Sequence, residues 1–307
     1  MELRQLRYFV MTAKYGSFSR AARELGMATS ALSQQISKLE TELSTRLLRR
    51  LASGTELTDA GFSFLEQAQL ALRHSDNAIL AAQNARLSGI VAIGMPFSSG
   101  YMIAPLFTAA MRRRYPDIKL RIVELQSSNL ALLVASRQLD FAFLTKFREK
   151  RDLASMVVSE RLCLFTPADK EPLPVDTSGE IAVRDIGNLP LLLPSKNHGL
   201  RLLIDNAFQR AGNRPNLVAE TDGTGILAAH VNAGLGSTIQ AASFSLRLPT
   251  AHCQMISDED AVLSHYLVSL RDDEMSTVAV AARKVFRQVV KQTVQSGTWP
   301  GASFHES

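Results

Sequence analysis

The spacing of apolar residues over the first 58 positions constrains the fold of this chain more than any other feature. One set of apolar residues recurs at helical spacing up to Gly16, and a second, shorter set ends at Gly26. Only the residues MATS separate the second set from a third, which continues to Leu43. Because glycine favours the left-handed conformation that ends helices, the pattern predicts helix, tight turn, helix. Hydroxyl residues are expected to cap the second and third helices: Ser17 or Ser19, and Thr29 or Ser30.

The following residues predict a wing and a long helix. The stretches LLRR and TELT indicate two short strands around a turn at residues 52–54, which completes a winged helix-turn-helix domain over 1–58. No proline interrupts the next stretch, so a helix of roughly 40 Å is expected within 59–88. Its larger apolar residues lie near a seven-residue repeat, which is typical of a helix that pairs with a second helix. These residues are Phe62, Leu65, Leu72 and Ile79.

The character of the sequence changes at residues 87–89, where strands begin to alternate with helices. Strands are expected over 90–94, 118–125 and 140–145, with helices over 101–115 and 130–137 between them. This alternation predicts a mainly parallel sheet covered on both faces. A second set of elements follows, and the chain returns through HYLVSLR to a helix over about 277–293.

The expected fold class is therefore α/β multidomain, with a winged helix-turn-helix, a long linker and dimerisation helix over 59–88, and a two-lobed domain over 89–295. Lobe I is expected over about 89–160 and 267–295, and lobe II over about 161–266. Residues 296–307 are predicted to form a flexible tail.

Composition narrows the class of protein further. The 307 residues are 46% hydrophobic and 21% charged, as in ordinary globular domains. No stretch is apolar enough for a membrane span, and the first residues lack the apolar core of a signal peptide, so a cytoplasmic location is expected. Cys163 and Cys253 lack metal-ligand spacing, so neither a metal site nor a disulfide framework is predicted.

The net charge is concentrated near the start of the chain. Residues 1–58 carry nine Lys and Arg against five acidic residues, a balance of +4 within a total of +5. This distribution favours a polyanion-binding N-terminal module.

The third helix has the residue types that a DNA-reading helix needs. With Leu32, Ile36 and Leu39 turned toward a core, its polar residues face outward. Short hydroxyls can approach phosphates closely, and a glutamine amide can pair with adenine. The alternative is that the hydroxyls only cap the helix and the other residues are solvated. The outward residues are Thr29, Ser33, Gln34, Ser37 and Lys38.

The N-terminal motifs resemble a known family. The run LRQLRYFVMTAKYGSFSRAARELGMATSALSQQISKLETELSTRLLRR, followed by LTDAG, is similar to the signature of the LysR-type transcriptional regulators. The stretches SGIVAIG, YPDIKLRI, LDFAF and VNAGLGSTI fit the effector-binding region of that family in order and position. Within the family, LLLPSKNHGLRLLIDNAF resembles the nitrogen-assimilation-control branch.

The resemblance implies a homodimer or homotetramer that binds double-stranded DNA at an interrupted inverted repeat and contacts RNA polymerase. Many members have proline where Ser30 stands, a cation where Gln34 stands, and phenylalanine where Leu48 stands. A glutamine in place of a cation favours adenine over guanine or phosphate. The wing tip also lacks the basic residue that often enters the minor groove. The DNA-contacting positions are Thr29, Ser30, Ser33, Gln34, Lys38, Arg49 and Arg50.

The resemblance also implies a periplasmic-binding-protein-like effector domain that holds its ligand between two lobes. Polar residues at the expected helix starts would suit a small organic anion, because helix N-termini attract negative charge. Helix capping alone would select the same residue types, so both interpretations stay open. The candidate effector-binding residues are Ser98, Ser99, Gly100, Ser128, Asn129, Thr145, Ser195, Asn197, His198 and Arg201.

Two patterns that resemble enzyme motifs are incomplete. GTGILA lacks the acidic residue of a dinucleotide site, and FSSG lacks the flanking glycine of a nucleophile elbow. No enzyme activity and no cofactor are therefore predicted. The sequence favours a regulator whose activity responds to an anion or a partner at the cleft. The alternative is a cytoplasmic small-molecule binding protein whose N-terminal helices only dimerise it.

Overall fold

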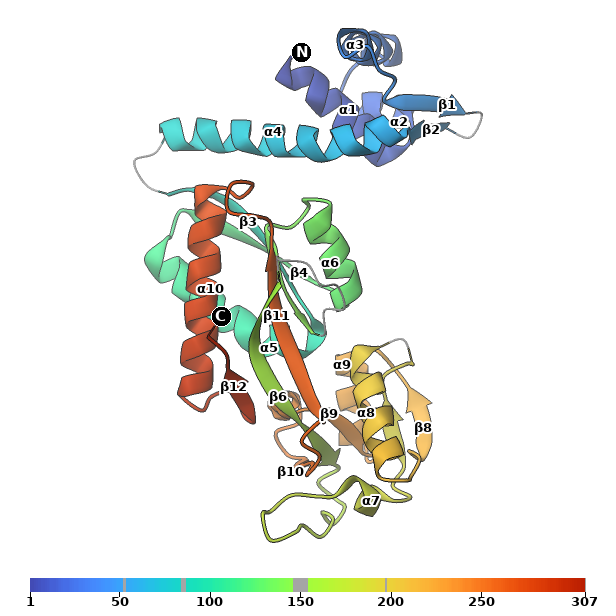
Figure 1. The fold of residues 1–307 in the computed structure, drawn as a ribbon, viewed down its shortest axis with the longest axis vertical. Coiled ribbons are helices and arrows are strands. Elements are labelled where there is room, and N and C mark those ends of the chain that lie inside the picture. The colour runs from blue at the N-terminus through green and yellow to red at the C-terminus, as the bar shows by residue number, and fades with distance from the viewer. Residues whose placement is uncertain (52–53, 84–86, 146–153, 197, 307) are drawn as a thin grey trace. The chain divides into compact units, whose positions relative to one another are not determined.

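The computed structural model describes residues 1–51, 54–83, 87–145, 154–196 and 198–306 (Figure 1). The chain forms two compact units, Met1–Gly89 with Asp272–Thr277, and Ile90–Arg271 with Val278–Ser307. The first is called the winged unit and the second the effector unit. Among the described residues, no helix is long and apolar enough to cross a membrane.

The winged unit has the predicted order of elements. Three helices are followed by a two-stranded antiparallel sheet, the wing, and by one long helix. The turn residues 52 and 53 lie outside the described part of the chain. The elements are α1 (Leu3–Tyr15), α2 (Phe18–Glu24), α3 (Thr29–Glu42), β1 (Leu48–Leu51), β2 (Gly54–Leu57) and α4 (Asp59–Gln83).

Helix α1 ends and helix α2 begins as the sequence predicts, whereas the start of α3 differs from the prediction. Gly16 ends α1 with φ of 58°, and the Ser17 hydroxyl caps α2 by accepting from the Arg20 N–H at 3.4 Å. The prediction that Thr29 or Ser30 caps α3 is wrong. Ala28 occupies the cap position in extended conformation, and its carbonyl accepts from Leu32 N–H at 3.1 Å. The Thr29 and Ser30 side chains are therefore exposed helical residues that make no cap.

A buried carboxylate joins α3 to the wing. Glu40 is only 6% exposed, and its Oε1 accepts from the Leu47 and Leu48 N–H groups at 2.8 and 3.0 Å. Its Oε2 accepts from Arg46 at 2.8 Å. These bonds satisfy backbone donors that would otherwise be buried without partners, so the wing starts at a defined point relative to α3.

The base of the wing is also fastened to the start of α4. The Thr58 hydroxyl accepts from Gly61 N–H at 3.0 Å and donates to the Arg46 carbonyl at 2.7 Å. The Thr58 N–H donates to the Leu47 carbonyl at 3.0 Å. A Cβ atom at Gly61 would lie 2.0 Å from that carbonyl oxygen, so only glycine allows this approach.

The effector unit is built on a mixed sheet with the strand order β10-β6-β11-β5-β3-β4. The predicted mainly parallel sheet is wrong for its centre. β3 and β5 pair in parallel, but β5–β11, β11–β6 and β6–β10 are antiparallel. The reason is that β6 and β11 carry the chain in opposite directions and pair directly with each other. The proposed lobe boundaries at 160/161 and 266/267 fall inside these two strands.

The effector unit consists of the following elements in chain order, most of which Figure 1 labels. They are β3 (Gly89–Met95), α5 (Phe97–Arg114), β4 (Ile118–Glu124), α6 (Ser127–Ala135), β5 (Phe141–Thr145), β6 (Ala154–Thr166), α7 (Val183–Ile186), β7 (Leu191–Leu193), α8 (Gly199–Arg210), β8 (Leu217–Glu220), α9 (Thr224–Asn232), β9 (Thr238–Ala241), the 3-10 helix η1 (Ala242–Arg247), β10 (His252–Met255), β11 (Val262–Ser269), α10 (Thr277–Gln295) and β12 (Ala302–Phe304).

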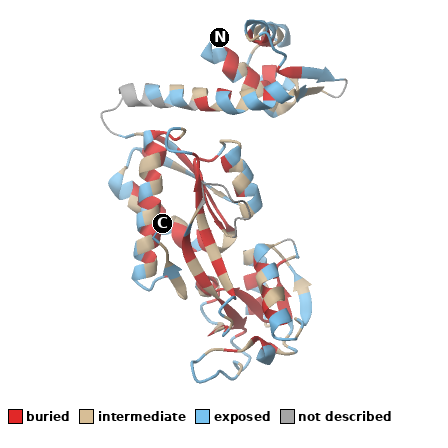
Figure 2. Ribbon diagram, in the orientation of Figure 1, coloured by how far each residue is buried: buried red, intermediate tan, exposed pale blue. Residues whose placement is uncertain are grey.

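Buried residues follow the central strands and the inward face of α10 (Figure 2). Phe286 of α10 makes edge contacts with Phe107, Phe141 and Phe143, with ring centroids 5.3 to 5.8 Å apart. A polar pair lies within this core, where His265 Nε2 is 3.0 Å from Glu160 Oε2 and both side chains are fully buried. Glu160 Oε1 also accepts from Ser243 N–H at 2.6 Å, which ties η1 to the crossing strands.

The predicted flexible tail is wrong for the described residues after α10. Trp299 is 1% exposed and packs edge-on against His265, with ring centroids 5.3 Å apart. β12 then pairs antiparallel with β6, opposite Glu160, Ser159 and Val158. Burial of a large aromatic side chain together with backbone pairing holds this segment in place.

Candidate nucleic-acid interface and effector pocket

The polar face of α3 is exposed and lies opposite its buried face. Leu32 and Leu39 are 0% exposed and Ile36 is 2% exposed. Ser33 is half-buried, and the other predicted outward residues are exposed: Thr29, Ser30, Gln34, Ser37 and Lys38. A helix held by one apolar face while a polar face is free can enter a major groove.

The structure brings together two predicted contact residues that are distant in sequence. The Arg50 guanidinium lies 4.6 Å from the centre of the Phe18 ring and donates a hydrogen bond to Ser33 Oγ. Stacking on an aromatic ring and a hydrogen bond together restrict the rotamers of a long side chain. Arg50 is thus held beside α3, with Phe18 as a support that sequence reasoning missed.

The neighbouring Arg49 has a different environment. It pairs with Glu56 across the wing at 3.2 Å, and both side chains are more than half exposed. An exposed pair of this kind contributes about 1 kcal/mol or less, so a DNA phosphate could displace Glu56 at small cost.

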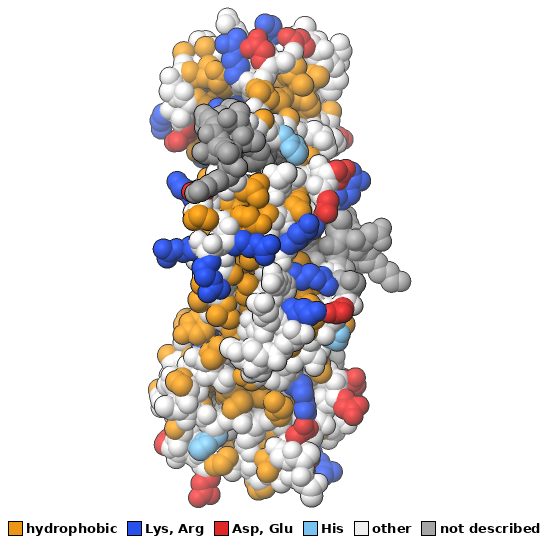
Figure 3. Space-filling model, turned by 90° about the vertical axis from the view of Figure 1, so that its left-hand side faces the viewer, with side chains coloured by type: hydrophobic (Ala, Val, Ile, Leu, Met, Phe, Trp, Pro, Cys, Tyr) orange, Lys and Arg blue, Asp and Glu red, His pale blue; other side chains and the backbone are white. Residues whose placement is uncertain are grey.

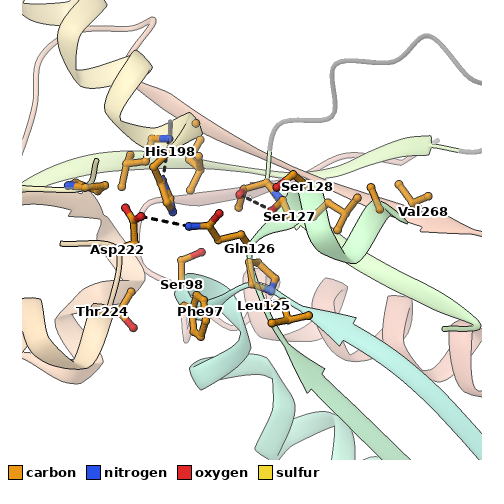
Figure 4. Close-up of a pocket in the computed structure, with 18 of the residues that line it drawn as sticks. Phe97, Ser98, Leu125, Gln126, Ser127, Ser128, His198, Asp222, Thr224 and Val268 are labelled. Atoms are coloured by element: carbon orange, nitrogen blue, oxygen red, sulfur yellow. Dashed lines mark hydrogen bonds between the residues drawn. The ribbon is translucent and has the colours of Figure 1, made fainter. Parts of the chain in front are cut away.

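A second site is a cavity of about 920 Å³ in the effector unit (Figure 4). Its wall combines residues at the start of α5 and α6, the end of β5, the segment before α8 and the segment after β8. Apolar side chains such as Phe97, Leu132 and Leu227 form much of the lining. Volume and composition are those of a site for a small organic molecule.

The structure separates the predicted effector-binding residues into two groups. Four of them line the cavity. Five others are described by the structure but do not line the cavity. Asn197 lies outside the described residues. The lining residues are Ser98, Ser128, Thr145 and His198. Those away from the lining are Ser99, Gly100, Asn129, Ser195 and Arg201.

Arg201 is engaged in structure and has little left for a ligand. The side chain is 5% exposed, and its Nε donates to Asp205 at 2.8 Å. Its Nη1 lies 2.6 Å from Glu220 and also donates to the Pro194 carbonyl at 2.9 Å. Two carboxylates thus neutralise a buried cation and fix α8 to the end of β8.

Asp222 is the functional candidate that sequence reasoning missed. It lines the cavity and accepts from the Ser195 N–H at 2.9 Å and the Ser195 hydroxyl at 3.0 Å. The Gln126 amide reaches Asp222 from the start of α6 at 3.3 Å (Figure 4). Its position shortly after a strand could have indicated Asp222, because the same kind of position predicts Ser128 and Thr145.

The charge of Asp222 follows from these partners. Burial alone would raise its pKa, but the hydrogen bonds from Ser195, the nearby His198 and the Gln126 amide outweigh burial and lower it. The pKa of His198 is lowered by burial, partly opposed by Asp222. At neutral pH the cavity therefore presents a carboxylate beside a neutral imidazole, whose Nδ1 accepts from Leu200 N–H at 3.3 Å.

Two more polar groups line the cavity. Ser127 Oγ lies 2.9 Å from Thr145 Oγ1 and accepts from Thr145 N–H at 3.0 Å, which connects α6 to the end of β5. Gln240 of β9 is 3% exposed, and its Nε2 has no hydrogen-bond partner among the described residues. A buried donor without a partner is rare in folded proteins.

Basic side chains also gather on one face of the effector unit (Figure 3). The last turn of α5 supplies Arg112, Arg113 and Arg114, and Arg114 donates to Gln288 of α10 at 3.4 Å. Cations at a helix C-terminus interact favourably with the helix dipole, so this cluster has a structural explanation.

Comparison with known families identifies the class of protein. Residues 3–62 match the bacterial regulatory helix-turn-helix protein model of the LysR family, and residues 84–291 match the LysR substrate binding domain. The chain belongs to the LysR family of DNA-binding transcriptional regulators, which have a ligand-binding effector domain. The family consists of regulators and not enzymes, and the alternative of a binding protein with merely dimerising helices is set aside.

Individual relatives agree with this assignment. The chain is 32% identical over 243 residues to the HTH-type transcriptional regulator AlsR of Bacillus subtilis, covering 78% of this chain and 80% of AlsR. It is also 32% identical over 243 residues to the nitrogen assimilation regulatory protein nac of Escherichia coli, covering 78% of both chains. The sequence identity to AlsR therefore equals the identity to the nitrogen assimilation protein, whose branch the sequence resembles.

Solved structures show the same fold. A full-length OxyR variant from Pseudomonas aeruginosa gives a TM-score of 0.70 at 22% identity, covering 95% of both chains. Full-length CbnR complexed with its target DNA gives a TM-score of 0.56 at 21% identity, covering 94% of this chain and 100% of CbnR.

Proposed function

We propose that the chain regulates transcription as a homodimer or homotetramer that reads an interrupted inverted repeat with α3 and the wing. The main support is the exposed polar face of α3 with Arg50 held beside Ser33 by Phe18. In this proposal Thr29, Ser30 and Lys38 contact phosphates, Gln34 reads a base, and Arg49 and Arg50 flank the groove. The protein acts in the cytoplasm, where it contacts RNA polymerase.

The long helix supports the proposed pairing of subunits. Phe62 of α4 is 61% exposed, and Leu65 and Leu72 are half-buried. The side chain of Ile79, the last residue of the predicted repeat, lies outside the described residues. If a second copy of the chain covers an exposed large aromatic residue on a long helix, the burial of its apolar surface stabilises the pair. Two paired winged units would place two α3 helices on half-sites about 34–36 Å apart or at a multiple of that distance.

DNA binding tests this proposal directly. The full-length protein should retain duplex DNA that carries an interrupted inverted repeat and release duplex of scrambled sequence. If the protein contacts about six phosphates, raising the salt concentration from 50 to 200 mM should weaken binding on the order of a thousandfold. Retention that is indifferent to sequence and salt would contradict the proposal.

Replacing Gln34 with alanine should relax specificity at one base pair. A bidentate amide contact to adenine is worth about 1–3 kcal/mol of discrimination, so the preference at that position should fall by about five- to 150-fold. Overall affinity should change less. Binding of a library of single-base variants of the site measures both quantities.

Gln292→Ala is the matched control, because Gln292 is an exposed glutamine on the unrelated helix α10. This variant should leave every base preference unchanged. A uniform loss of affinity across all sites in Gln34→Ala would instead assign Gln34 to a phosphate contact.

The effector unit supplies the proposed control of DNA binding. The cavity joins the start of α6 to the segments before α8 and after β8, so a ligand there contacts both lobes. We infer that a small molecule with a carboxylate binds in this cavity and alters the placement of the subunits. Such couplings are typically about 1–3 kcal/mol, enough to change operator affinity by about five- to 150-fold.

A further inference from the structure

The effector cavity combines groups of opposite character in one wall. Asp222 contributes a carboxylate, while Lys196 lines the same cavity one residue after Ser195, the partner of Asp222. Gln240 also lines the cavity. A ligand that binds here must satisfy both a negative group and free donors.

The carboxylate of Asp222 disfavours a ligand that carries only negative charge. It is oriented by three hydrogen bonds, from the backbone and hydroxyl of Ser195 and from the amide of Gln126. Those bonds hold it ionised, and Arg201 cannot offset its charge because Asp205 and Glu220 already pair with that cation. An anion placed beside Asp222 would be repelled, whereas an ammonium group would form an ion pair in a partly desolvated site.

The other polar groups of the cavity favour a ligand group that accepts hydrogen bonds. The Lys196 ammonium is a cation, and the long helix α5 begins at the cavity with Phe97 and Ser98. A carboxylate would accept hydrogen bonds from the Lys196 ammonium and form an ion pair with it. The backbone N–H groups at the start of α5 favour the same charge.

We propose that this cavity binds a zwitterion of the amino-acid class with an apolar side chain. Its ammonium group lies at Asp222, its carboxylate at the donors of the wall, and its side chain against Phe97, Leu132 and Leu227. The inference rests on the proposed function of the cavity as an effector site and names the chemical class of the effector. Asp222 is then the residue that distinguishes an amino acid from a simple carboxylate.

Matched ligands test the inference on the full-length, unmodified protein. Each apolar amino acid is compared with the carboxylate that lacks its amino group and the amine that lacks its carboxylate, for example phenylalanine, phenylpropanoate and phenylethylamine. Calorimetry and thermal shift measure the affinities. The amino acid of at least one set should bind at least about tenfold more tightly than both partners, since each partner lacks one ion pair.

The Asp222→Asn variant tests the assigned residue. It should reduce the preference for the amino acid over its carboxylate by about tenfold or more while the carboxylate itself binds as well or better. Asp260→Asn is the matched control, because Asp260 is 78% exposed and pairs only loosely with Arg210 at 3.8 Å. It should leave the preference unchanged.

The outcomes separate this inference from the broader one. Carboxylates that bind as tightly as the amino acids would overturn the zwitterion and leave the carboxylate effector standing. Amines that bind most tightly, or no binding by any member of the panel, would overturn both. A preference for amino acids that Asp222→Asn leaves intact would overturn the role of Asp222.

Discussion

Replacing Gly61 with alanine should strongly destabilise the winged unit and weaken DNA binding. The added methyl carbon would meet the Leu47 carbonyl oxygen at 2.0 Å, a backbone atom that cannot move without breaking its bond from Thr58 N–H. The start of α4 and the base of the wing would have to separate. Overpacking in a closely fitted site costs about 1–3 kcal/mol and more where backbone must shift, so we expect a loss of about 3 kcal/mol or more.

Urea unfolding followed by circular dichroism, together with operator binding, measures this effect. Gly225→Ala is a control with the same chemical change, because Gly225 also lies in a helix but has no atom within 4 Å of the added carbon. That variant should be neutral or more stable by up to about 1 kcal/mol, since alanine favours helix over glycine. A Gly61→Ala protein as stable as the wild type would show that α4 does not approach Leu47 so closely.

Replacing Arg201 with methionine should destabilise the effector unit by about 1–3 kcal/mol, mainly because the buried Pro194 carbonyl would lose its donor, whereas Asp205 and Glu220, 40% and 39% exposed, can be hydrated by water. Asp205 and Glu220 bind Arg201 at 2.8 and 2.6 Å. Thermal unfolding of the full-length protein measures the loss.

Arg184→Met is the control for this change. Arg184 is 79% exposed and lies 3.8 Å from Asp185, so its replacement should alter stability by no more than about 0.5 kcal/mol. The sequence pattern places Arg201 among the effector contacts. If that assignment were right, Arg201→Met would fold with normal stability and lose its ligand response.

At Gly61 and Arg201 the physical role of the residue depends on contacts that the sequence pattern does not show. The LTDAG stretch belongs to a family signature, but the need for Gly61 comes from a carbonyl oxygen fourteen positions earlier in the chain. Arg201 is a candidate by sequence because it follows a polar segment near a helix start. Its partners, Asp205 and Glu220, lie up to 19 residues away and make it structural.

The errors about the sheet and the tail have a common origin in long-range pairing. Alternating strands and helices predict a mainly parallel sheet, but the alternation does not reveal that β6 and β11 pair directly in opposite directions. The loose composition of the last residues predicts a flexible tail. A single buried side chain, Trp299, and the pairing of β12 with β6 hold them.

Local patterns in the sequence were enough to predict the helices, the wing and the outward face of α3, because helical spacing depends on residues three or four positions apart. The family followed from the resemblance of the N-terminal motifs to a known signature. Which side chains meet across the fold became known only from the three-dimensional arrangement. Arg50 and Ser33 are 17 residues apart, Ser195 and Asp222 are 27 apart, and Gln126 and Asp222 are 96 apart. Such contacts depend on which strand ends and helix starts adjoin, and local spacing carries no record of that arrangement.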